Sequence, residues 1–160
     1  MKRAVRWTLF FGILTLIAVL VIFENSLQSR LSSSQRSGTV LALLLPLLRR
    51  IPWIPRRAYH RLIRKAAHMI EFAALGFSLT GLCFALPGER TPRRCAGMAA
   101  AAVLIAMLDE TIQLFTGRSG SVLDVLLDFS GALCGLLLAM ACRKLWKLCH
   151  KRHRPTEVDK

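Results

Sequence analysis

Four long runs of apolar residues constrain this chain more than any other feature. The first extends from Trp7 to Phe23 without a charge, and the others cover residues 66–86, 95–115 and 122–142. A helix that crosses the hydrocarbon core of a bilayer needs about 20 residues, and backbone in lipid must satisfy its own hydrogen bonds. The sequence therefore predicts an all-α integral membrane protein, built as a bundle of about four transmembrane helices.

Composition supports this class once the positions of the charges are considered. Hydrophobic residues make up 54% of the 160 residues, above the roughly 45–50% of soluble domains. The 23 Lys and Arg residues outnumber the 9 Asp and Glu residues, which by itself would suggest a nucleic-acid binder. Because most basic residues lie between the apolar runs, the pattern excludes a disordered basic tail, a disulfide scaffold and most soluble DNA-binding folds. We expect membrane lipids as partners, and no nucleic acid.

The remaining segments have their own signatures. A shorter apolar stretch near residues 40–55 contains Pro46 and Trp53 and is too short to span the membrane. It predicts an interfacial or re-entrant segment, with a loop packed on the bundle as the open alternative. We expect a single transmembrane domain over residues 1–142 and a basic cytoplasmic tail over residues 143–160.

The distribution of basic residues also predicts an orientation. Lys2, Arg3 and Arg6 precede the first run, and no small-residue cleavage pattern follows it, which indicates an uncleaved signal anchor. The side of the N-terminus holds 13 Lys and Arg residues, and the other side holds 10. By the positive-inside rule, we expect a multi-pass protein of the plasma membrane with both termini in the cytoplasm.

Polar side chains enter the last three runs near their ends. Because consecutive spans run antiparallel, the start of 66–86, the end of 95–115 and the start of 122–142 lie at one depth. With both termini inside, this depth is the outer half of the membrane. An ionised side chain in lipid costs about 2.5–3.5 kcal/mol, so such groups should face the bundle interior and pair. The candidate binding residues of this polar cluster are Lys65, His68, Glu71, Asp109, Glu110, Gln113, Arg118, Asp124 and Asp128.

Helix spacing and chemistry refine this prediction. Asp124 and Asp128 share a stripe with Gly131 and Gly135, whose Gly-x-x-x-Gly spacing lets another helix approach closely. A buried polar network that only fixes helix register is the alternative to a working site. The histidine and carboxylates are suitable ligands for a divalent metal, but their pattern is not a specific signature. We therefore predict no metal and no other cofactor.

Three motifs within residues 64–135 are characteristic in their order. They are Arg64-Lys65-Ala66-Ala67-His68-Met69-Ile70-Glu71-Phe72, Asp109-Glu110-x-x-Gln113 with the Gly117-Arg118 turn, and Asp124-x-x-x-Asp128-x-x-Gly131-x-x-x-Gly135. This set resembles the VanZ-like family, although Phe72 stands where that family usually has Tyr. The family is named for a membrane protein that confers low-level resistance to the glycopeptide teicoplanin. The resemblance implies a bacterial cell-envelope protein and leaves its reaction, if any, undefined.

Three functions follow as hypotheses. The first is an envelope protein that binds a lipid-linked anionic precursor, or the glycopeptide itself, at the outer leaflet and so affects teicoplanin susceptibility. The second is an intramembrane metal-assisted hydrolase or transferase for a phospholipid-like substrate, with His68 or Glu110 as general base and Arg118 clamping phosphate. The third is a small proton-coupled transporter subunit with a carboxylate relay, for which four spans would require a homo-oligomer.

Overall fold

Four long helices form most of the chain that the structure describes. The computed structural model describes residues 2–28, 45–46, 55, 58–88, 92–118 and 121–152. The helices are α1 (Lys2–Leu27), α3 (Tyr59–Ala85), α4 (Pro92–Phe115) and α5 (Val122–Arg152). No strand occurs within those described ranges. All four helices are long and apolar enough to cross a membrane, so the predicted all-α architecture is confirmed.

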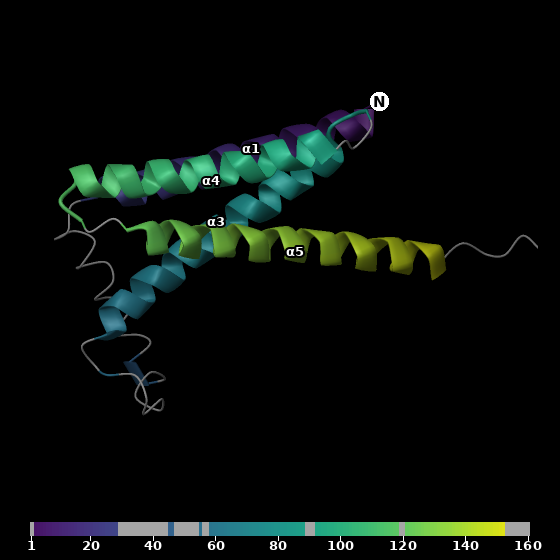
Figure 1. Ribbon diagram of the computed structural model, residues 1–160. Coiled ribbons are helices and arrows are strands. Elements are labelled where there is room, and N and C mark those ends of the chain that lie inside the picture. The colour runs from purple at the N-terminus through teal and green to yellow at the C-terminus, as the bar shows by residue number, and fades with distance from the viewer. Residues whose placement is uncertain are drawn as a thin grey trace, which may run out of the picture.

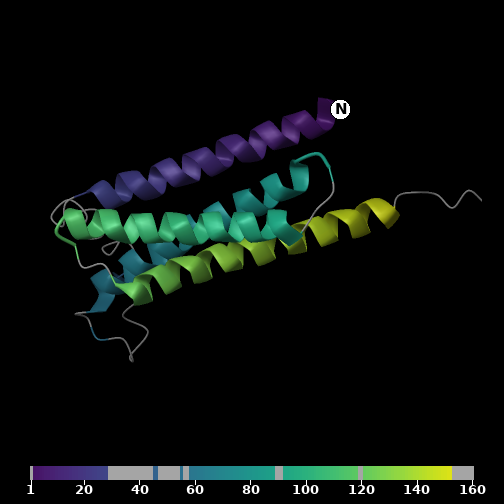
Figure 2. The same ribbon diagram turned by 45° about the horizontal axis from the view of Figure 1, so that its top comes forward.

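The helices run alternately up and down along one bundle (Figure 1). The start of α1 and the last turns of α5 lie at the same end, which we call the terminal end, and Figure 2 shows the same arrangement from another side. At the opposite end, which we call the polar end, α1 and α4 finish and α3 and α5 begin. Helix α3 is central, because it packs extensively along α5 and α1 and also contacts α4.

Glycines bring α3 and α5 together backbone to backbone. A Cβ atom on Gly131 would lie 2.6 Å from the carbonyl oxygen of Met69, and one on Gly135 would overlap the carbonyl of Ala73. Gly76 in α3 meets the α5 backbone in the same way. The Gly-x-x-x-Gly stripe therefore packs against α3, two helices back in the sequence, and not against α4.

A small apolar core joins all four helices, while their outer faces are also apolar. The core consists of Ile22 from α1, Phe72, Leu75 and Leu79 from α3, Ala102 and Ala106 from α4, and Ala132 from α5. Many large apolar side chains point outward, among them Leu9 and Leu16 of α1, each more than half exposed. Soluble monomers rarely expose apolar patches of this extent, whereas hydrocarbon solvates them.

Two helices continue past the C-terminal ends of the apolar runs that predicted them. Helix α1 continues past residue 23 to Leu27, and α5 continues past residue 142 to Arg152. Neither extension contains Gly or Pro, so the change from apolar to polar side chains does not end the helix. The first ten residues of the predicted tail, 143–152, thus prolong the fourth helix.

Helix α3 also begins earlier than predicted, at Tyr59 rather than at residue 66. The predicted interfacial segment near residues 40–55 lies outside the described residues, except for residues 45–46 and 55. Of these, Leu45 packs against Tyr59 and Ile63 in the first turns of α3.

Candidate functional site

The polar end gathers the side chains that the sequence placed at one depth. They come from α3, α4, α5 and the turn between α4 and α5. Five of them are buried, namely Asp109, Glu110, Gln113, Arg118 and Asp128. The side chains of His68, Glu71 and Asp124 are partly buried, and that of Lys65 is 47% exposed. The polar cluster therefore has a buried interior and a partly exposed rim.

Asp109 is the most completely buried group of the cluster, and both of its oxygens accept hydrogen bonds. Ser26 Oγ donates to Oδ1, and Gln113 Nε2 donates to Oδ2 at 2.8 Å. Ser26 is itself fully buried and belongs to the last turn of α1. Asp109 thus joins α1 to α4 and has its own polar atoms satisfied.

Arg118 is turned into the cluster by the loop that follows α4. Gly117 has a φ of +73°, a conformation that favours glycine, and Arg118 N donates to Gln113 O at 2.9 Å. The guanidinium donates from Nη1 to the carbonyl oxygen of Asn25 at 3.0 Å, and Nη2 lies 3.2 Å from His68 Nε2. Burial, followed by the positive charge of Arg64, lowers the pKa of Arg118. No described carboxylate oxygen lies within 4.0 Å of this guanidinium.

The contact with Arg118 determines the tautomer of His68. Because the guanidinium only donates, Nε2 of the neutral ring accepts and Nδ1 carries the proton. Nδ1 lies 3.7 Å from Asp109 Oδ2 and 3.9 Å from Glu71 Oε2, too far for hydrogen bonds. Glu71 is held through its other oxygen, Oε1, which accepts from Asn25 Nδ2 at 2.7 Å. His68 therefore directs an uncommitted N–H toward two carboxylates.

The rim of the cluster is formed around the start of α5. Lys65 Nζ pairs with Asp124 Oδ1 at 2.6 Å, and Ser121 Oγ donates to Asp124 Oδ2 at 2.9 Å. The backbone N–H of Ser121 donates to Glu110 Oε2 at 2.9 Å. Beneath this rim is a cavity of about 20 Å³, enough for one water-sized group. Its lining residues are Arg64, Lys65, His68, Glu110, Gln113, Asp124, Leu127 and Asp128.

Asp128 lies one helical turn below Asp124 and is 1% exposed. Its Oδ2 atom is buried and has no hydrogen-bond partner among the described residues. Glu71 Oε2, His68 Nδ1 and Arg118 Nε share this property. The cluster thus contains two uncommitted acceptors and two uncommitted donors.

Comparison with known protein families places the chain in one of them. The profile of the VanZ/LLP1 family matches residues 10–144, which include all four helices' central parts and the whole polar cluster. The chain belongs to the VanZ/LLP1 family. This confirms the resemblance inferred from the motifs in residues 64–135. Comparison with curated proteins and with solved structures found no match.

The polar cluster of this VanZ/LLP1 chain includes residues that the sequence analysis did not select. Asn25 and Ser26 contact Glu71, Asp109 and Arg118 from α1. Both lie beyond Phe23, the last residue of the first apolar run. Ser26 follows the buried Ile22 at i+4, so continuing the helical pattern by one turn would have placed it on the buried face.

Three residues of the cluster are placed to hold a divalent cation. His68, Asp109 and Asp128 each offer one ligand atom, and these atoms lie within 4.8 Å of one another. Ligation through His68 Nε2 would displace Arg118 from that nitrogen. Ligation through Nδ1 would move the ring proton to Nε2, where it would face an N–H of Arg118. Either mode requires Arg118 to move, so the present arrangement favours a site without metal.

Proposed function

We propose that this VanZ/LLP1 chain binds the headgroup of a lipid-linked anionic envelope precursor at the polar end of its bundle. The observation that carries the proposal is Arg118, a buried guanidinium without a carboxylate partner among the described residues. Its contacts are a backbone carbonyl and a histidine nitrogen, and its Nε atom has no partner. A phosphate would neutralise this cation and match its planar donors.

The carboxylates around Arg118 specify the remainder of the headgroup. Glu71 Oε2 and Asp128 Oδ2 are buried acceptors that receive no hydrogen bond from the described residues. Inorganic phosphate at neutral pH offers mainly acceptors, whereas a sugar or peptide attached to phosphate also offers hydroxyl or amide donors. A phosphate linked to such a group would satisfy the arginine and the acids together. We therefore favour a phosphate that carries a glycosyl or peptidyl group over inorganic phosphate or a headgroup without hydrogen-bond donors.

The rim provides a route for such a group. The ion pair between Lys65 and Asp124 lies above the small cavity, and its lysine side chain is 47% exposed. An exposed ion pair contributes about 0–1 kcal/mol, so separating it costs little. Separating the pair would widen this water-sized cavity toward His68, which contacts Arg118, and so admit a headgroup. The lipid chain would stay in the bilayer against the apolar outer faces of the helices.

This binding would link the protein to glycopeptide susceptibility. The excess of basic residues on the side of the termini predicts that the polar end faces outward. A protein that covers a lipid-linked precursor at the outer leaflet of the plasma membrane would change the access of teicoplanin to it. Binding of the glycopeptide itself by the same rim is the other form of this proposal.

The test compares Arg118→Gln with Arg61→Gln, a control at an exposed arginine in the first turn of α3. Binding of a polyprenyl-phosphate-linked sugar to the purified protein is measured by native mass spectrometry, and teicoplanin susceptibility is measured in cells with equal protein levels. Loss of a charged hydrogen-bond donor should weaken binding about tenfold to a hundredfold. We expect Arg61→Gln to retain both properties. Unchanged binding and susceptibility in Arg118→Gln would refute the proposal.

A metal-assisted reaction on a phospholipid-like substrate is the second candidate. It is favoured by the three ligand atoms of His68, Asp109 and Asp128. The two candidates differ in a direct measurement, the metal content of protein purified without chelators. Stoichiometric metal that disappears in His68→Gln would support the enzyme. Metal below one-tenth of the protein concentration, together with precursor binding, would support the binding function.

A further inference from the structure

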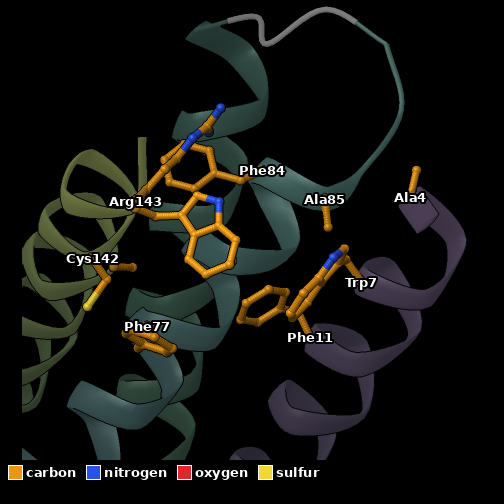
Figure 3. Close-up of a pocket in the computed structure, with 11 residues that line it drawn as sticks. Ala4, Trp7, Phe11, Phe77, Phe84, Ala85, Cys142 and Arg143 are labelled. Carbon is orange, nitrogen blue, oxygen red and sulfur yellow. The ribbon is translucent and has the colours of Figure 1, made fainter. Parts of the chain in front are cut away.

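A second cavity lies at the terminal end, far from the polar cluster. It occupies about 550 Å³ between α1, α3 and α5, a volume typical of ligand pockets of roughly 300–1,000 Å³. Figure 3 shows Trp7 and Phe11 of α1 on one side, and Phe84 with Arg143 on the other. The lining is mostly aromatic and apolar, and we call this cavity the aromatic groove.

The groove lies where α1 and α5 separate toward the terminal end, as Figure 1 shows. Helix α1 remains attached to α3 on this side: a Cβ atom on Gly81 would overlap the ring of Phe11. Trp7 stacks on Phe11 with ring centroids 6.0 Å apart, and Phe11 lies 6.4 Å from Phe77. One wall is therefore a packed aromatic surface, and its opposite wall is α5.

Charge distinguishes this end of the molecule from the other. The Arg143 guanidinium carbon lies 4.1 Å from the centroid of the Phe84 ring, a cation–π contact that holds the charge beside the groove. The other basic side chains described at this end are Lys2, Arg6, Arg93, Arg94, Lys144 and Lys147. The carboxylates of the described helices, from Glu24 to Asp128, all lie toward the polar end.

We propose that the aromatic groove binds an anionic phospholipid, with an acyl chain along the aromatic wall and the phosphate at Arg143. The apolar lining matches hydrocarbon, and the positive end matches the phosphate and any further negative charge. Trp7 and Trp146, which both line the groove and are more than half exposed, are residues that favour headgroup depth. This site is separate from the proposed precursor site and does not depend on it.

A zwitterionic phospholipid would fill the same groove and also present a phosphate to Arg143, but the positive charge of its headgroup would offset part of that attraction and would be repelled by the basic residues at this end. A basic residue near a membrane surface favours an anionic lipid about fivefold. The preference for an anionic over a zwitterionic lipid is therefore the property to measure, and it should depend on Arg143.

The experiment uses the full chain in nanodiscs with Trp53→Phe, so that tryptophan fluorescence comes from Trp7 and Trp146, the two that line the groove. Phospholipids with brominated acyl chains quench tryptophan on contact. At equal mole fraction, brominated phosphatidylglycerol should quench more than brominated phosphatidylcholine, with an apparent affinity about fivefold higher. Arg143→Gln should abolish this difference, and Arg143→Lys should retain most of it.

Lys144→Gln is the matched control, because Lys144 carries the same charge on the same helix and does not line the groove. We expect it to retain the preference. Equal quenching by the two lipids in the unmodified groove, or equal loss of preference in Arg143→Gln and Lys144→Gln, would overturn the proposal. Quenching by neither lipid would also overturn it, because the groove would then be covered by protein, such as a second copy of the chain.

Discussion

Individual residues of the polar cluster fall into two groups according to their hydrogen bonds. Ser26, Asp109 and Gln113 form a closed set in which both carboxylate oxygens are used. Asp128 and Arg118 retain buried atoms without partners among the described residues. An unsatisfied buried polar atom costs about 1–3 kcal/mol, so several at one place require a partner, which a water, an ion or a ligand can supply. Our proposal therefore assigns a structural role to the first group and ligand binding to the second.

Ser26→Ala should destabilise the protein without removing a ligand contact. It leaves Asp109 Oδ1 without its donor inside the bundle, and we expect a loss of about 1–3 kcal/mol in the free energy of unfolding. Ser130→Ala is the control, since Ser130 Oγ donates only to Leu127 O of its own helix. That change should cost less than about 0.5 kcal/mol. Denaturation in detergent followed by circular dichroism measures both values, and equal losses would contradict this account.

Asp128→Asn should have the opposite profile, with stability retained and binding impaired. The amide has the shape of the carboxyl group and replaces an acid buried in the same interior as Asp109 and Glu110. We expect unfolding stability to stay within about 1 kcal/mol or to rise. Affinity for the lipid-linked headgroup should fall about tenfold, because one of the two acceptor oxygens of Asp128 is replaced by an amide nitrogen that only donates. If unfolding stability instead fell by more than about 3 kcal/mol, the carboxylate would be a structural group.

At the scale of elements, the sequence predicts helices better than it predicts their ends or partners. Length and hydrophobicity are sufficient for four helices, because hydrocarbon leaves the backbone no alternative. The apolar runs end before α1 and α5 do, since a polar residue can leave the bilayer without breaking the helix. The partner of the Gly131 and Gly135 stripe was not predictable either. A Gly-x-x-x-Gly motif specifies a close approach, and the topology of the bundle selects α3.

The same limit applies to the pairing of neighbouring acids. Asp109 and Glu110 are adjacent in sequence and share a depth, which the antiparallel arrangement of spans predicts. Their side chains differ by about 100° around the helix, so they reach different partners. Asp109 meets Ser26 of α1, whereas Glu110 meets the backbone N–H of Ser121 before α5. These partners depend on how α1 and α5 flank α4, and spacing along one helix carries no such information.

The close contact between α3 and α5 should be sensitive to any side chain added at its glycines. In Gly135→Ala, the added methyl group would overlap the backbone of α3, so the two helices must separate. Overpacking of this kind costs about 1–3 kcal/mol or more, and it should also disturb the cluster that these helices position. Gly12→Ala is the matched control, because nothing lies within 4 Å of a Cβ atom there. Thermal unfolding in detergent should separate the two variants, and equal midpoints would show that the close approach is dispensable.

Acidic and basic side chains are distributed unevenly along the long axis of the bundle. Described carboxylates occupy the polar end, and the terminal end carries basic side chains around the aromatic groove. With four helices long enough to span a membrane, the two proposed sites would lie on opposite sides of it. The orientation then decides which leaflet each site serves.

The orientation of the bundle in the membrane can be tested with single cysteines and a membrane-impermeant maleimide. A variant that retains only Cys149, exposed near the end of α5, should react only after the cells are lysed. Arg61→Cys in a cysteine-free background, exposed at the start of α3, should react in intact cells. The side of the termini holds 13 basic residues and the other side holds 10. By the positive-inside rule, which counts Lys and Arg near the ends of spans, this small excess places the termini in the cytoplasm. The reverse pattern would place the polar cluster in the inner leaflet, which would exclude direct contact with an extracellular glycopeptide and leave headgroup binding at Arg118 to be tested on its own.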